Sequence, residues 1–99
     1  MKLREIAHAR TGDKGSVLTI SLIAWKAEDF QRIAERITAQ AVSQRFAPLI
    51  VAPAVRYELP RLHALNFVLT RPASRGVTST LALDMHGKCL GDLLLDMEI

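Results

Sequence analysis

Hydrophobic residues alternate with polar or small ones along residues 17–25, and this pattern predicts a strand. One face of that strand carries Leu18, Ile20, Leu22 and Ala24, and the other carries Val17, Thr19, Ser21 and Ile23. A shorter stretch over residues 3–10 predicts a strand before it, and residues 10–15 supply the glycines of a turn. Together they predict a β-hairpin, with His8 and Arg10 on its first arm.

The spacing changes to that of a helix over residues 27–40. Apolar side chains recur every three or four residues, at Phe30, Ile33, Ala34, Ile37 and Ala41. Glu28 and Asp29 fall in the first turn, where negative charge complements the helix dipole. A shorter helix is expected over residues 42–46, ending before Pro48 because the residue before a proline avoids helical conformation.

Residues 50–70 contain one predicted strand and one segment that fits two patterns. Residues 50–59 alternate as a strand, in which Pro53 indicates a sheet edge or a bulge. Over residues 62–70, the apolar positions fit helical spacing, and Pro60 suits a first helical turn. Residues 66–70 could equally form a strand. We favour the helix, since a glycine-containing turn and a β-rich pair follow.

Two last strands are expected over residues 77–84 and 92–98, with Gly87 in the turn between them. The predicted order is therefore β-β-α-β-α-β-β. This order indicates an α+β, ferredoxin-like two-layer sandwich, with a mostly antiparallel sheet and helices on one face. The uncovered face and the edge strands would favour a homo-oligomer or a partner protein. Candidates for that contact are Val17, Ile23, Trp25 and Val77.

Composition narrows the class of protein. The 99 residues are enough for one domain, over residues 1–99. The net charge of +3 is scattered without runs, which argues against a nucleic-acid partner and suits a small anion or an acidic surface. One cysteine, Cys89, excludes an internal disulfide and a cysteine-based zinc site. With no leader-like start and no apolar run that could span a membrane, we expect a soluble cytoplasmic protein.

Residues 8–16 concentrate the candidate chemistry. The site residues are His8, Arg10, Thr11, Gly12, Asp13, Lys14, Gly15 and Ser16. Backbone N–H groups near the two glycines could form a nest for an anion, with charge from Arg10 and Lys14. The alternative is a hairpin turn in which Asp13 caps N–H groups and pairs with either cation. The spacing is neither that of a P-loop nor G-x-G-x-x-G.

A second candidate cluster comprises Tyr57, Glu58, His63 and Asn66. On the favoured helix, His63 and Asn66 are three residues apart and could line a pocket with His8. We favour the alternative, in which Asn66 caps backbone groups and His63 is solvated. Glu58 is expected to pair with Arg10 or Lys14 across the sheet. The histidines lack ligand spacing, so neither a metal nor a cofactor is predicted.

Three separated motifs carry a family resemblance. Residues 7–15 resemble the H-A-R-S-G-D-K-G opening of the small domain of acyclic terpene utilisation (AtuA-type) proteins, with Thr11 in place of the serine. Residues 57–60 with 62–69, and the ending over residues 87–99, are similar to later parts of that domain. The resemblance runs over nearly the whole chain in the same order.

The resemblance implies a ferredoxin-like fold and a bacterial protein. In that family the domain is usually the C-terminal part of a larger protein and is sometimes a separate small chain. The larger proteins are linked to breakdown of acyclic terpenes, and similar ones accompany acyl-CoA metabolism. The expected function is thus an accessory subunit that docks onto a larger AtuA-type protein. The alternative is a stand-alone small enzyme, or an acyl-CoA- or carboxylate-binding protein, that uses His8, Arg10 and Lys14.

Overall fold

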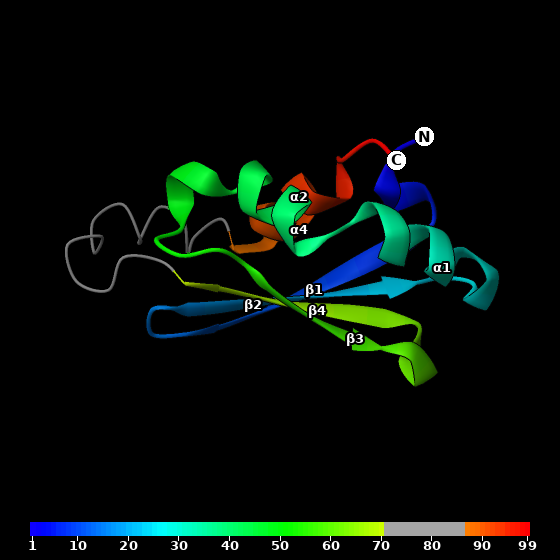
Figure 1. Ribbon diagram of the computed structural model, residues 1–99, viewed down its shortest axis with the longest axis horizontal. Coiled ribbons are helices and arrows are strands. Elements are labelled where there is room, and N and C mark those ends of the chain that lie inside the picture. Colours follow the sequence, from blue (N-terminus) through cyan, green and yellow to red (C-terminus); the bar gives the residue numbers. More distant parts are fainter. Residues whose placement is uncertain (71–86) are drawn as a thin grey trace.

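The computed structural model describes residues 1–70 and 87–99 and confirms an α+β, ferredoxin-like fold (Figure 1). The strand predicted over residues 77–84 lies outside the described residues, as do the side chains of Asp13, Pro48, Lys88 and Cys89. The order within the described part is β1, β2, α1, α2, β3, β4 and α4. None of the described helices is long and apolar enough to cross a membrane.

Four antiparallel strands form the sheet in the order β1-β2-β4-β3. Their bounds are Ala7–Lys14 for β1, Val17–Ala24 for β2, Val55–Leu59 for β3 and Ala64–Thr70 for β4. The predicted hairpin of β1 and β2 is confirmed, but its first strand starts later and runs further than expected. Residues 3–5 form a 3-10 turn, and residues 10–14 belong to β1 because an edge strand tolerates their polar side chains.

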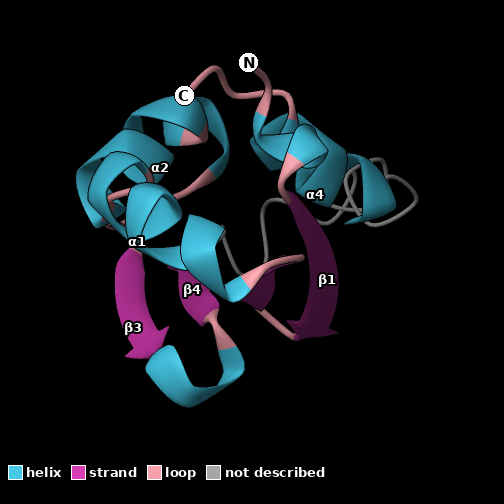
Figure 2. Cartoon of the chain, turned by 90° about the vertical axis from the view of Figure 1, so that its right-hand side faces the viewer, coloured by secondary structure: helices cyan, strands magenta, loops and turns pink. Residues whose placement is uncertain are grey.

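The helices are α1 (Ala27–Arg36), α2 (Ala39–Arg45) and α4 (Gly87–Leu95), and all lie on one face of the sheet (Figures 1 and 2). The first predicted helix ends early, because Thr38 starts a new one: its hydroxyl oxygen accepts a hydrogen bond from the Ala41 N–H at 3.0 Å.

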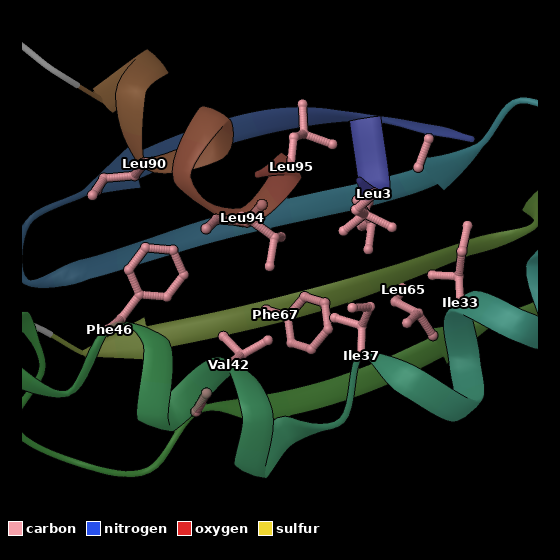
Figure 3. Packing of buried hydrophobic residues seen from close by; sticks show 14 of the residues in the cluster. Leu3, Ile33, Ile37, Val42, Phe46, Leu65, Phe67, Leu90, Leu94 and Leu95 are labelled. Atoms are coloured by element: carbon pink, nitrogen blue, oxygen red, sulfur yellow. The ribbon is translucent and has the colours of Figure 1, made fainter. Parts of the chain in front are cut away.

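The core lies between the helices and the sheet (Figure 3). Phe67 of β4 is fully buried there beside Ile37, which directly follows α1, and Val42 of α2. Leu90 and Leu94 of α4, four residues apart, complete the cluster above β1 and β2. The alternation predicted for β2 is confirmed, since Leu18, Ile20, Leu22 and Ala24 are its buried residues.

Two element predictions in the second half of the chain are wrong. Residues 64–70 form β4 rather than a helix, because Leu65, Phe67 and Leu69 are buried with a period of two. Pro60 starts a 3-10 turn, which His63 ends in the left-handed conformation with φ 53°. Residues 92–98 are not a strand: Gly87 begins α4 instead of forming a turn, and only a Lys2–Glu98 β-bridge remains near the end.

Candidate functional site

The sheet face opposite the helices, here called the open face, is covered by none of the described segments (Figures 1 and 2). Strand register places fifteen residues on it: His8, Arg10, Gly12, Lys14, Val17, Thr19, Ser21, Ile23, Val55, Tyr57, Leu59, Ala64, Asn66, Val68 and Thr70. The open face therefore combines half of the first candidate cluster with part of the second.

A row of polar side chains crosses all four strands of the open face. Arg10 lies opposite Ser21, which lies opposite Asn66, which lies opposite Tyr57. Directly opposed side chains in antiparallel strands are close neighbours. The Ser21 hydroxyl donates a hydrogen bond to the Asn66 side-chain oxygen at 3.1 Å. The fold thus aligns Arg10, Asn66 and Tyr57 in one row across the sheet, with Asn66 next to Tyr57 and Arg10 at the opposite edge.

His8 lies at the other end of β1 from the hairpin turn and contacts an aromatic ring. Its imidazole stacks on Trp25, with ring centroids 4.1 Å apart and planes 26° apart. Trp25 is 64% exposed. Among the described side chains, no carboxylate orients the His8 ring, as a general base needs. The contact makes His8 and Trp25 a pair of stacked rings at this end of the open face.

Gly12 forms the floor of a hollow on the open face. The hollow has a volume of about 450 Å³ and is lined by Gly12, Lys14, Val17 and Thr19. A Cβ atom on Gly12 would stand 2.7 Å from the Thr19 hydroxyl oxygen, so any side chain there would collide with Thr19. The hydroxyl itself donates a long hydrogen bond of 3.5 Å to the Gly12 carbonyl.

The predicted N–H nest is not formed at Gly12. Gly12 lies within β1 opposite Thr19, and an extended backbone turns successive N–H groups to opposite sides. The turn consists of Gly15 and Ser16 only, and Gly15 has a φ of 64°. This is the sign that a type II′ turn requires at its first central position. Register turns Thr11 to the helix-facing side of β1.

Arg10 also borders a second pocket, at the edge of the sheet. This pocket has a volume of about 460 Å³ and lies between β1 and α4, lined by Ala9, Arg10, Thr11, Gly91, Asp92 and Leu95. Because β1 is an edge strand, the Arg10 side chain lies at the border between this pocket and the open face.

Glu58 and His63 do not join the open face. Glu58 pairs with Arg56 at 2.7 Å, so its predicted pairing with Arg10 or Lys14 is wrong. The reason is topological: β3 and β1 are opposite edges of the sheet, and Glu58 points to the helix side. His63 packs edge-on against Phe30, with centroids 6.1 Å apart. It does not converge with Asn66, because the two residues do not share a helix.

One family model, the AtuA ferredoxin-like domain, matches residues 1–99, which is the whole chain. The chain belongs to this family. No curated protein and no solved structure matches the chain. In this AtuA ferredoxin-like domain, the first two resemblance motifs lie in one sheet but on opposite sides of β2, and the third forms α4 beside β1.

The two groups with shifted pKa values, Arg4 and Asp96, lie away from the open face of this AtuA ferredoxin-like domain. Arg4 donates from Nε to the Asp96 carboxylate at 3.2 Å, near the two chain ends. That hydrogen bond lowers the pKa of Asp96 and raises the pKa of Arg4. In residues 1–70 and 87–99, no three His, Cys, Asp or Glu side chains lie close enough to hold a metal ion.

Sequence reasoning missed two hydroxyl residues of the AtuA ferredoxin-like domain, Thr19 and Ser21. Their placement on one face of a strand was visible in the alternation of residues 17–25. The missing information was the register of the hairpin, which depends on a two-residue turn at Gly15 and Ser16. With that register, Thr19 lies opposite Gly12, and Ser21 lies opposite Arg10.

Proposed function

We propose that this chain is a non-catalytic binding domain that docks its open face onto a larger protein. The observation that carries the proposal is a set of large apolar side chains left exposed on and beside that face, three on β3 and one next to His8 of β1. Trp25 is 64% exposed, Tyr57 55%, Val55 46% and Leu59 39%. An apolar surface of this kind, rimmed by polar groups, is typical of protein–protein contact sites.

The residue types support docking rather than catalysis. Trp, Tyr and Arg are the residues that most often dominate binding energy at protein interfaces. Here Trp25, Tyr57 and Arg10 lie on or beside one exposed surface. Arg10 and Lys14 add positive charge, and no described carboxylate lies within ion-pair distance of either. A fitting partner therefore presents an apolar patch with acidic residues.

The partner we propose is a larger AtuA-type protein without this domain. The resemblance motivates this choice, since the family's domain occurs both fused to such proteins and as a separate chain. The role in terpenoid or acyl-CoA catabolism, and the cytoplasmic location, follow from the same proposal. Docking in trans would then replace the covalent link of the fused proteins.

Calorimetric titration of the purified chain into an AtuA-type large protein from the same genome tests the proposal. Micromolar or tighter binding is expected. Trp25→Ser and Tyr57→Ser should each weaken it at least tenfold, because exposed aromatic anchors lose their buried area. Leu93→Ser is the matched control, since Leu93 is 41% exposed on α4 in the helix layer.

Two results would contradict the proposal. One is the absence of binding to such large proteins. The other is a dimer of this chain that is lost in Tyr57→Ser but not in Leu93→Ser, because the open face would then belong to a second copy. Light scattering of the free chain distinguishes this case.

The Gly12 hollow favours part of the second candidate function, anion binding with Arg10 and Lys14. The proposal includes binding but not catalysis by His8. The His8 ring stacks on Trp25, and no carboxylate among the described side chains orients it. Titration with coenzyme A thioesters tests this function. Binding that is unchanged by Arg10→Ala and by Lys14→Ala would contradict it.

A further inference from the structure

We infer that the hollow over Gly12 is an oxyanion site, in which a carboxylate or phosphate binds between the Lys14 ammonium and the Thr19 hydroxyl. This inference deepens the proposed function, since it assigns a ligand class to one part of the open face. The isolated chain can bind such a ligand whether or not a larger protein docks.

Spacing along β1 places two cations around the hollow. Arg10, Gly12 and Lys14 are alternate residues of one strand, so they share a face. At about 3.3 Å per residue, the Cα atoms of Arg10 and Lys14 are about 13 Å apart, with Gly12 midway. Lys14 lines the hollow itself, and Arg10 stands at its flank. An anion over Gly12 thus lies beside the Lys14 side chain, with Arg10 two residues further along the same face of the strand.

The Thr19 hydroxyl lies directly beside Gly12, at the base of the hollow of about 450 Å³. With no side chain on Gly12, the backbone and the Thr19 hydroxyl are exposed to whatever sits above them. The hydroxyl makes one hydrogen bond, at the long distance of 3.5 Å. Because a hydroxyl group rotates freely, it can turn from that carbonyl and donate to an oxyanion instead. Val17 supplies an apolar wall on one side of the hollow.

Arg10 and Lys14 differ from the basic residues that form ion pairs elsewhere in the described part of the chain. Arg4 and Lys2 pair with Asp96, and Arg56 pairs with Glu58. Lys14 and Arg10 have no ion pair with any carboxylate that the structure describes. Glu58, the expected counter-charge, faces the opposite side of the sheet. Among the described side chains, the positive charge of the open face thus has no carboxylate partner.

Amide NMR of the full chain tests the inference with sodium phosphate and sodium acetate as probes. Ionic strength is held constant with sodium chloride. Saturable shifts are expected at the amides of Gly12, Lys14, Val17 and Thr19. Lys14→Met and Thr19→Val should weaken binding at least tenfold, because the first removes the charge and the second removes the donor. Lys26→Met, which removes another exposed lysine, should leave binding unchanged.

Shifts that stay linear up to the highest concentration of both salts would overturn the inference. So would binding that is equally strong in Lys14→Met. Gly12→Ala fills the floor and should also abolish binding. If that variant fails to fold, the Lys14 and Thr19 variants still decide, since both positions tolerate the changes as exposed or β-branched strand residues.

Repeating the titration with the larger protein present distinguishes the sources of the oxyanion. Displacement of acetate on docking would assign the site to a carboxylate of the partner. Retention would assign it to a free small molecule. If the larger protein does not bind, the titration of the isolated chain still reads the site, so failure of the proposed function and failure of the oxyanion site are separable.

Discussion

Gly12 and Gly15 belong to one short motif, but the structure requires glycine at the two positions for different reasons. Gly15 adopts φ 64° in the hairpin turn, a backbone conformation that residues other than glycine rarely adopt. Gly12 is an extended strand residue, and it lacks a side chain because Thr19 occupies the space beside it. From the sequence alone both glycines read as turn residues. Only the register separates a conformational requirement from a steric one.

Gly15→Ala should lower the free energy of unfolding by about 1 kcal/mol, because a Cβ atom strains the left-handed region. Gly15→Asn should cost less, since asparagine tolerates that region better. Urea unfolding of the two variants measures the difference. Equal stability of Gly15→Ala and the unchanged chain would contradict the turn geometry.

At the scale of elements, long-range contacts decided what local patterns left open. Residues 17–24 were predictable as a half-buried strand, because alternation carries that information. Residues 62–70 were not, because leucines at helical spacing also fit the burial pattern of β4. Residues 92–98 alternate in sequence, yet Leu90 and Leu94 are buried on α4. The sequence predicted the two groups of candidate residues separately. Their position on one open face depends on the pairing of β2 with β4, which are distant in the sequence.

Arg56 joins two elements by binding the end of α1. Its guanidinium donates to the carbonyl oxygens of Ala34 at 2.6 Å and Ile37 at 3.1 Å, which helix termination leaves without partners. Arg56→Met should therefore lower the free energy of unfolding by about 2 kcal/mol. Arg56→Lys should recover only part, because an ammonium lacks the planar fork. Denaturant unfolding measures both variants, with the exposed Arg61→Met as control.

Gly91 lies where α4 packs against β1. A Cβ atom there would stand 3.4 Å from Thr11 Cγ2 and 3.6 Å from the Ala9 Cβ, which is ordinary contact. Gly91→Ala should thus raise stability by up to about 1 kcal/mol through helix propensity. Gly91→Leu should lower it by about 1–3 kcal/mol by overpacking. Thermal or urea unfolding checks the two signs, and a destabilised Gly91→Ala would contradict the packing.

At the scale of the whole molecule, the two ends of the chain hold each other. The Leu3 N–H donates to the Met97 carbonyl at 2.8 Å, and the Ile99 N–H donates to the Met1 carbonyl at 3.0 Å. The terminal ammonium of Met1 pairs with Glu98 at 3.2 Å. These contacts close the helix layer at the side away from the open face (Figure 1).

Asp96 should make part of the stability depend on pH. Its folded pKa lies below the ordinary value of 3.8, because Arg4 donates to the carboxylate. The contribution is therefore complete above about pH 5 and is lost as pH falls below 3.8 through the folded pKa. Asp96→Asn should be slightly less stable than the unchanged chain at about pH 7 and equal to it at about pH 2. Urea unfolding at both values tests this, and a gap that persists in acid would contradict it.

The position of the ends has a consequence for tethering. Both ends leave the molecule from the helix layer (Figure 1), so a linker attached to either one starts on the far side from the open face. With a short linker, the open face cannot reach the large part of the same fused chain, and the domain would then dock onto the large part of a neighbouring copy. A longer linker permits docking within one chain, at the effective concentration that its length sets. Linker length would therefore decide whether a fused protein of this kind assembles with itself or with others.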